Sequence, residues 1–213
     1  MSERSYRLLL WTLALTGLIL DQASKYAVFS WLQSKSGPST YPLVVFSKDG
    51  NGGALGFQLS TRFEPAPDGS LVPHVNKGAL FGWLSNHQNL ANGGFAVVSL
   101  LAAVAIAYWS FQKATVRDPW LCAALGLILA GTLGNLYDRV VFDGVRDFLH
   151  WNYLFDWPVF NLADCCLVCG AFLLLIQAFG TQPGPAGPET ARPEVSALPG
   201  VHPRAGVQAA PKA

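Results

Sequence analysis

The sequence predicts an all-α membrane protein with four transmembrane helices, a small extracytoplasmic β-containing cap and a disordered C-terminal tail. Three observations predict this class. Only 13% of the 213 residues are charged, against about 25% in ordinary soluble domains. Hydrophobic residues make up 51% of the chain, and its mean hydropathy is +0.31. Four apolar segments also approach the length of about 20 residues that a helix needs to cross a bilayer.

The four predicted spans differ in the polar residues that they carry. The first has Asp21 and Lys25 in its second half, and the second has no charge. The third ends in GNLYDR, and the fourth begins with FNLAD. In chain order the spans are expected at about residues 8–31, 93–111, 120–137 and 159–179.

The segments outside the spans form a long loop and a tail. Residues 32–92 are the extracytoplasmic loop. Residues 180–213 are rich in Pro, Gly and Ala and cannot bury a core, so we expect a disordered tail. The first span follows Arg4 and Arg7, as a signal peptide would, but it leads into DQASK rather than a small-x-small site. We therefore expect a retained helix.

Small residues recur along the third span. Gly126, Ala130 and Gly134 are four positions apart and share one narrow helix face. Such a face lets membrane helices approach closely. The alternative is that glycine and alanine are simply common in membrane helices.

The orientation follows from charges near the helix ends. Arg4, Arg7, Lys113 and Arg117 lie in short segments on the side of the N-terminus. The two sides carry equal numbers of Lys and Arg, so only this proximity to helix ends makes the first side cytoplasmic. Both termini are then cytoplasmic.

The opposite membrane face collects polar residues from three spans and one link. An ionisable residue within a span is costly and is a functional hypothesis by default. Helix parity places the following residues together at this face: Asp21, Lys25, Asn135, Asp138, Arg139, Asp147, Asn161 and Asp164.

Some of these residues also have structural explanations. Asp21 and Lys25 are spaced as an i,i+4 ion pair that could clamp the first helix. Asn161 and Asp164 fit a helix N-cap with an acid three positions on. Asp147 has no helix end to cap, because GVRDFLHW is typical of an extended, interfacial stretch.

Two carboxylates held together in a low-dielectric site cannot both ionise easily, so they share a proton. One then serves as a base that activates water, and the other serves as an acid. The start of the fourth helix favours the ionised form of Asp164. The residues leave open which aspartate holds the shared proton.

Other chemistries have little support in the composition. The net charge of +1 gives no reason to expect a nucleic-acid partner. The four cysteines fall inside apolar segments, and the four histidines have no metal-ligand spacing. We expect no metal site.

Four motifs in order resemble the bacterial lipoprotein signal peptidase (signal peptidase II) family of membrane aspartic endopeptidases. The resemblance spans residues 8–179. The motifs are DQASK at 21–25, NKGALFG at 76–82, GNLYDRVVFDGVRDF at 134–148 and FNLAD at 160–164.

The resemblance implies an enzyme of the bacterial inner membrane with its site toward the periplasmic leaflet. The family hydrolyses the signal peptide of diacylglyceryl-modified prolipoproteins on the N-terminal side of the lipidated cysteine. Its partners are these substrates and membrane lipids, and it needs no metal or other cofactor. The resemblance assigns the catalytic dyad to Asp147 and Asp164. It implies a role in substrate binding or support of the site for Asn76, Asn135, Asp138, Arg139, Asn161, Asp21 and Lys25.

The long loop contains two similar strings. NGGALGFQL covers 51–59, and NKGALFGWL covers 76–84. The second fits the family pattern better, so we choose Asn76 over Asn51 and interpret about 25 residues as an insertion. The substrate contacts of this loop stay open.

Three rival classes are less consistent with the sequence. A transporter usually has charges near the bilayer midplane and internal repeats. A serine-type membrane protease would need a Ser–Lys dyad. Ser24 and Lys25 cannot form one with each other, because adjacent residues point to different sides of a helix. A structural membrane subunit would not need Asp147.

Overall fold

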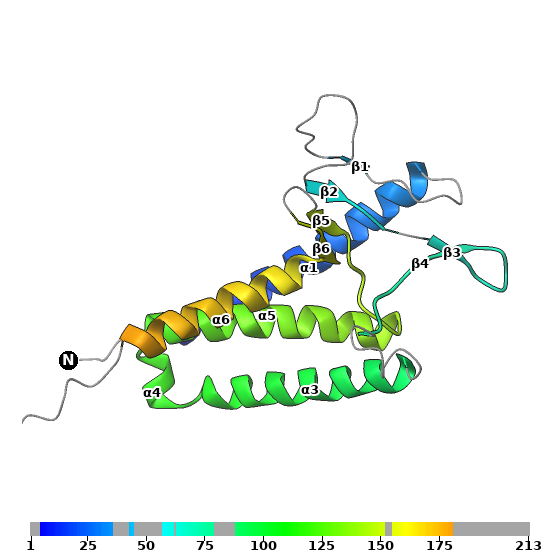
Figure 1. Ribbon diagram of the computed structural model, residues 1–213. Coiled ribbons are helices and arrows are strands. Elements are labelled where there is room, and N and C mark those ends of the chain that lie inside the picture. The colour runs from blue at the N-terminus through cyan, green and yellow to red at the C-terminus, as the bar shows by residue number, and fades with distance from the viewer. Residues whose placement is uncertain are drawn as a thin grey trace, which may run out of the picture. The chain divides into compact units, whose positions relative to one another are not determined.

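Long helices dominate the part of the chain that the structure describes. The computed structural model describes residues 5–35, 43–44, 57–61, 63–78, 88–151 and 155–180. Its long helices are α1 (Arg7–Lys35), α3 (Gln88–Trp109), α5 (Pro119–Val141) and α6 (Leu162–Gly180), and a short helix α4 (Lys113–Val116) precedes α5. In Figure 1, α5 lies between α3 and α6, and α1 crosses behind α5 and α6. The predicted disordered tail and Asn51 lie outside the described residues.

Three of these helices, α3, α5 and α6, are long and apolar enough to cross a membrane. Helix α1 has 29 residues but carries internal charges. The predicted start of the fourth span at residue 159 was three residues early. The reason is local: Trp157–Phe160 pair as a strand, and the helix begins only after Asn161.

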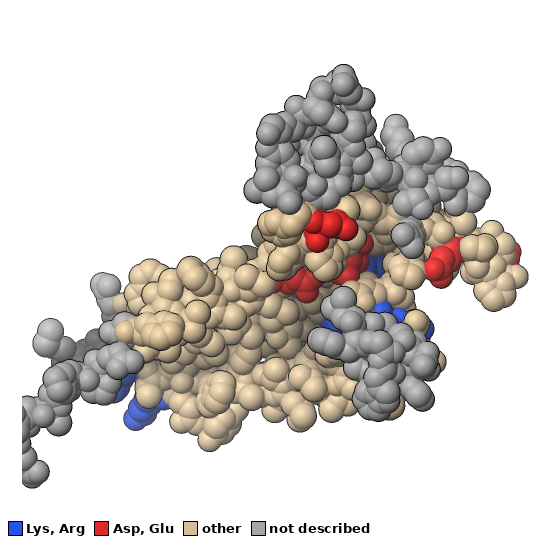
Figure 2. Space-filling view, viewed as in Figure 1, with Lys and Arg blue, Asp and Glu red and all other residues tan. Residues whose placement is uncertain are grey.

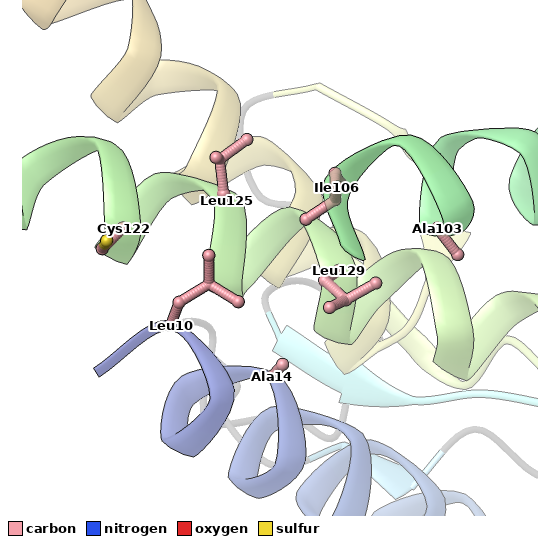
Figure 3. Close-up of a cluster of buried hydrophobic side chains, with 7 residues drawn as sticks. All are labelled: Leu10, Ala14, Ala103, Ile106, Cys122, Leu125 and Leu129. Carbon is pink, nitrogen blue, oxygen red and sulfur yellow. The ribbon is translucent and has the colours of Figure 1, made fainter. Parts of the chain in front are cut away.

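Helix α5 begins at a strong N-terminal signal. The side chain of Asp118 accepts hydrogen bonds from the backbone N–H groups of Trp120 and Leu121 at 2.9 and 3.1 Å, and Pro119 occupies the first turn. Figure 3 shows the apolar core that α5 shares with α1 and α3. The core consists of Leu10, Ala14, Ala103, Ile106, Cys122, Leu125 and Leu129.

The small-residue face of α5 packs closely against another helix, as predicted, and the structure shows that this helix is α1. A Cβ added to Gly126 would lie 2.6 Å from the carbonyl oxygen of Leu10. One added to Gly17 would lie 2.6 Å from the Cβ of Ala130, and one on Gly134 would meet a carboxylate of α1. The two helix backbones are therefore close enough that only small residues fit between them.

Within the described residues, six short strands lie at one end of the helices (Figure 1). An antiparallel four-stranded sheet has the order β1 (Leu43–Val44), β2 (Phe57–Leu59), β5 (Leu149–Trp151) and β6 (Trp157–Phe160). A separate hairpin consists of β3 (Phe63–Pro65) and β4 (Leu71–Pro73). The long loop supplies β1–β4 and the link between α5 and α6 supplies β5 and β6, so the β2–β5 pairing joins the loop to the link.

Gly126→Ala tests the close approach of α1 and α5. We expect it to destabilise the protein by about 1–3 kcal/mol, because the new methyl group meets backbone that cannot turn away. Thermal unfolding in detergent measures the effect. Gly94→Ala in α3 is the matched control, since a Cβ there meets nothing within 4 Å. Equal unfolding temperatures for the two variants would contradict the tight interface.

Candidate active site

Backbone pairing holds Asp147 in an extended segment. On one side of it, Asn76 and Val145 form an isolated antiparallel bridge, with N···O distances of 2.8 and 2.9 Å. On the other side, the backbone N–H of Phe148 donates to the carbonyl oxygen of Phe160 at 3.0 Å. Asp147 therefore lies between two fixed points of the backbone, two residues before strand β5 begins.

Asn161 connects the two aspartates. Its side-chain Nδ2 donates to Asp147 Oδ1 at 2.6 Å. Its backbone N–H donates to Asp164 Oδ2 at 3.0 Å, and its Oδ1 accepts the backbone N–H of Asp164 at 3.1 Å. The two carboxylates thus share one fully buried partner.

The reciprocal bonds of Asn161 and Asp164 are also a capping box at the start of α6. The predicted capping role is therefore correct, and it places Asp164 in the first turn of the helix. There the positive end of the helix dipole stabilises a negative charge. The cap and the carboxylate site use the same two side chains.

Asn76 is the loop residue beside Asp147. Its Nδ2 donates to Asp147 Oδ2 at 3.0 Å, and its Oδ1 accepts the backbone N–H of Gly78 at 2.8 Å. Gly78 has φ +82°, a conformation that suits glycine. This tight turn fixes which way the Asn76 amide points, so that a donor faces the carboxylate.

Asn135 is oriented by a buried ammonium group. Lys25 Nζ donates to Asn135 Oδ1 at 3.3 Å, which leaves the Nδ2 of Asn135 to donate to Asp164 Oδ1 at 2.8 Å. Asn161 Nδ2 also donates to Asn135 Oδ1 at 3.1 Å. The charge of Lys25 therefore determines the amide orientation that Asp164 meets.

A buried ion network lies below these amides. Lys25 Nζ lies 2.9 Å from Asp21 Oδ2 and 3.3 Å from Asp138 Oδ2, and all three side chains are 0% exposed. The i,i+4 pairing predicted for Asp21 and Lys25 is thus present. Asp21 Oδ1 also accepts the backbone N–H of Ala163 at 2.9 Å, which joins α1 to the start of α6.

Arg139 lies apart from this network. Its Nη1 donates to the carbonyl oxygen of Asn135 at 3.3 Å, and its guanidinium lies 5.3 Å from the ring centre of Phe95 in α3. Its neighbour Asp138 pairs instead with Lys25 and Arg146. Arg139 is half-buried on the side of the bundle where the aspartates lie.

The surroundings of Asp147 change its acidity. Burial raises the pKa of this half-buried carboxyl to about 6. The hydrogen bond from Asn76 opposes that rise, and the negative charge of Asp164 adds to it. The influence of Asp164 on this pKa follows from the closeness of the two acids.

A cavity of ≈ 430 Å³ opens beside Asp147, between the strands and the loop. Figure 2 shows acidic side chains gathered beside the strands, while the helical surface in this view is almost uncharged. The residues that line the cavity include Thr61, His74, Asn76, Asp147, His150 and Trp157.

Sequence reasoning missed two members of the site, the buried Arg146 and the half-buried Gln22. Arg146 is 2% exposed and donates to Asp138 Oδ1 at 2.9 Å, and Gln22 accepts from Arg146 at 2.8 Å. Both lie inside quoted motifs, DQASK and GVRDF, but neither has a spacing that reveals its partner. Their polar character within apolar surroundings was the available signal.

The fold and the site define a class: a multi-pass membrane protein with two carboxylates at one end of its helices. A family model described as signal peptidase (SPase) II matches residues 13–180. The chain belongs to the signal peptidase II family and is therefore a peptidase.

Relatives agree with this assignment, and a solved structure has the same fold. The lipoprotein signal peptidase of Rhodopirellula baltica is 36% identical over 188 residues, which cover 82% of this chain and 73% of the relative. That of Aeromonas hydrophila is 34% identical over 175 residues, which cover 81% and 89%. A solved bacterial membrane enzyme shares the fold with TM-score 0.61 and 22% identity, over 88% of this chain and 99% of its own.

Lys25→Met tests the buried ion network. Removing the ammonium group leaves two buried carboxylates without a shared cation, which we expect to cost about 3–5 kcal/mol of stability. Thermal unfolding in detergent measures the loss. Lys113→Met, at an exposed lysine of α4, is the control and should change little. If both variants unfold at the wild-type temperature, the network has no stabilising role.

Proposed function

We propose that this lipoprotein signal peptidase hydrolyses diacylglyceryl-modified prolipoproteins on the N-terminal side of the lipidated cysteine, with Asp147 and Asp164 as its catalytic dyad. The bridge through Asn161 carries the proposal, because one buried residue holds both carboxylates, Asp147 through its side-chain amide and Asp164 through its backbone N–H. Asp147 lines a cavity that can receive an extended peptide.

The surroundings of the two aspartates give them different roles. Asp164 accepts hydrogen bonds at both oxygens and lies in the first turn of α6. Burial raises the pKa of Asp147 to about 6. We assign the shared proton of the resting dyad to Asp147 and the role of base to Asp164.

Hydrolysis then follows the general acid–base logic of paired aspartates. Asp164 takes a proton from water as the water oxygen bonds to the scissile carbonyl carbon, and Asp147 gives its proton to the carbonyl oxygen. When the gem-diol collapses, the C–N bond breaks. The proton on Asp164 passes to the leaving amine of the lipidated cysteine, and a gem-diol proton returns to Asp147.

Helix α1 is the fourth membrane span of this proposal. Its two internal charges are paired and fully buried against α5. Its outer face exposes large apolar side chains to lipid, among them Leu8, Leu15, Ile19 and Leu20. Pairing thus removes the cost that the charges would otherwise impose on a span.

In the orientation that we propose, the strands and the dyad lie on the periplasmic side of the inner membrane. Lys113 and Arg117 lie between α3 and α5 at the opposite end, where the positive-inside rule puts the cytoplasm. Both termini are then cytoplasmic, residues 1–179 form the peptidase domain, and the strands form an extracytoplasmic cap. Lipid-modified prolipoproteins reach the site from the membrane.

Asp147→Asn and Asp164→Asn, tested separately, examine the dyad. Each should lower kcat by about 10²- to 10⁴-fold, because each removes one partner of the proton transfer. The assay is cleavage of a diacylglyceryl-modified prolipoprotein by purified protein in detergent or vesicles.

Asp143→Asn is the matched control for the dyad variants. Asp143 is an exposed neighbouring acid with φ 55°, a conformation that asparagine also adopts readily, so activity should stay near wild type. A chelator should leave cleavage intact. Near-wild-type turnover by either folded dyad variant would refute its catalytic role.

The pH profile tests which aspartate is the acid. If Asp147 must be protonated, kcat/KM falls about tenfold per pH unit above an apparent pKa of about 6. Asn76→Ala should move this alkaline limb to higher pH, because the Asn76 amide lowers the pKa of Asp147. Activity that instead rises through pH 6 and stays flat above it would make Asp147 the base.

A further inference from the structure

Arg146 is a buried charge that the proposed reaction does not use. It directly precedes Asp147, and its side chain is only 2% exposed. A buried cation is costly unless it is paired and fully hydrogen-bonded. Such a residue beside a catalytic group therefore needs an explanation.

The contacts of Arg146 converge on one carboxylate. Its Nη2 donates to Asp138 Oδ1 at 2.9 Å, and its Nε donates to Asp138 Oδ2 at 3.3 Å. Its backbone N–H donates to the same Oδ2 at 2.9 Å. Nη2 also donates to Gln22 Oε1 at 2.8 Å. Asp138 thus holds both the side chain and the backbone of the residue before Asp147.

Two aromatic rings enclose the guanidinium group. Its central carbon lies 4.0 Å from the ring centre of Phe142 and 4.4 Å from that of Tyr26. A planar group that forms two bonds to one carboxylate and stacks on rings suits arginine. Lysine would keep the charge but would lose both the paired bonds and the stacking.

Arg146 also balances the buried charge under the dyad. Asp21, Lys25, Asp138 and Arg146 are each at most 2% exposed, and their two positive and two negative charges cancel. Without Arg146 this group would carry one net negative charge beside Asp147 and Asp164. That charge would disfavour a further ionised carboxylate in the dyad.

The anchoring of Arg146 also orients the side chain of Asp147, the next residue in the chain. Arg146 is held on Asp138, whereas Asp147 accepts hydrogen bonds from Asn76 and Asn161. Because Arg146 directly precedes Asp147, holding its backbone and side chain also restricts the backbone that carries the Asp147 carboxylate. Backbone hydrogen bonds hold the link at Val145 and at Phe148. Between these two points, the side chain of Arg146 holds the link to the helices through Asp138.

We propose that Arg146 is a positioning residue of the peptidase, which sets the orientation of Asp147 through its paired bonds to Asp138. The inference rests on the proposed function of the dyad. A misplaced general acid slows the chemical step while lipid and peptide binding persist.

Arg146→Lys and Arg146→Gln test the proposal by steady-state cleavage of a diacylglyceryl-modified prolipoprotein. Both should lower kcat by about 10- to 100-fold with KM within about twofold of wild type. Arg7→Gln is the control, because Arg7 also stacks on a ring and donates to a backbone carbonyl, but at the other end of α1. It should leave kcat unchanged.

A double variant tests the route through Asp138. In the Asp138→Asn background, Arg146→Gln should cost a smaller factor in kcat than it costs in the wild-type protein. If the two substitutions lower kcat by independent factors that multiply in the double variant, the proposal is overturned. A folded Arg146→Lys variant that keeps the wild-type kcat, or that changes only KM, would also overturn it. If Arg146→Gln does not fold, Arg146→Lys decides, since it keeps the charge.

Wild type and Asp147→Asn are measured in the same assay. A wild-type protein that does not cleave the lipidated substrate would refute the proposed function itself. Cleavage that depends on Asp147 but is indifferent to Arg146 would refute only the positioning role.

Discussion

The site depends on one constraint: charges buried in an apolar helix bundle must cancel. Lys25 forms ion pairs with both Asp21 and Asp138, and Arg146 forms a second ion pair with Asp138. A network of this kind costs desolvation energy, so its contribution is specificity of arrangement more than stability. It fixes the relative positions of α1, α5 and the link, because breaking any pair would leave a buried charge alone. Asp21 extends the same constraint to the start of α6 through the backbone N–H of Ala163.

Asparagine side chains carry this arrangement from the network to the carboxylates. An amide has a donor end and an acceptor end, so one charged partner decides what its other end presents. Lys25 takes the acceptor of Asn135 and thereby turns a donor toward Asp164. Asn161 donates its side-chain amide to Asp147 and its backbone N–H to Asp164. Because amides do not ionise, they orient the dyad without adding another proton equilibrium to it.

The sequence was sufficient for features that depend on local pattern. It predicted the apolar helices, the small-residue face of α5 and the cap formed by Asn161 and Asp164, because hydropathy, spacing and capping are local properties. It did not reveal the ionic partner of Arg146, since a residue in an extended link can pair with any neighbouring element. The strand Trp157–Phe160 was also missed, because its partner is set by tertiary pairing and its apolar residues continue into α6.

The described part of the long loop contacts Asp147 through one side chain, that of Asn76. The hairpin β3–β4 packs on α1, where Phe63 lies edge-on to Phe29 and Gln33 donates to the carbonyl oxygen of Leu71. The loop then reaches the link through the Asn76–Val145 bridge, beside Gly144, where a Cβ would lie 2.7 Å from a methyl carbon of the loop. Thus the described part of the loop supplies one amide to Asp147, while helices and link fix both carboxylates. We therefore expect an insertion before the bridge to change the walls of the cavity beside Asp147 and to leave the two carboxylates in place.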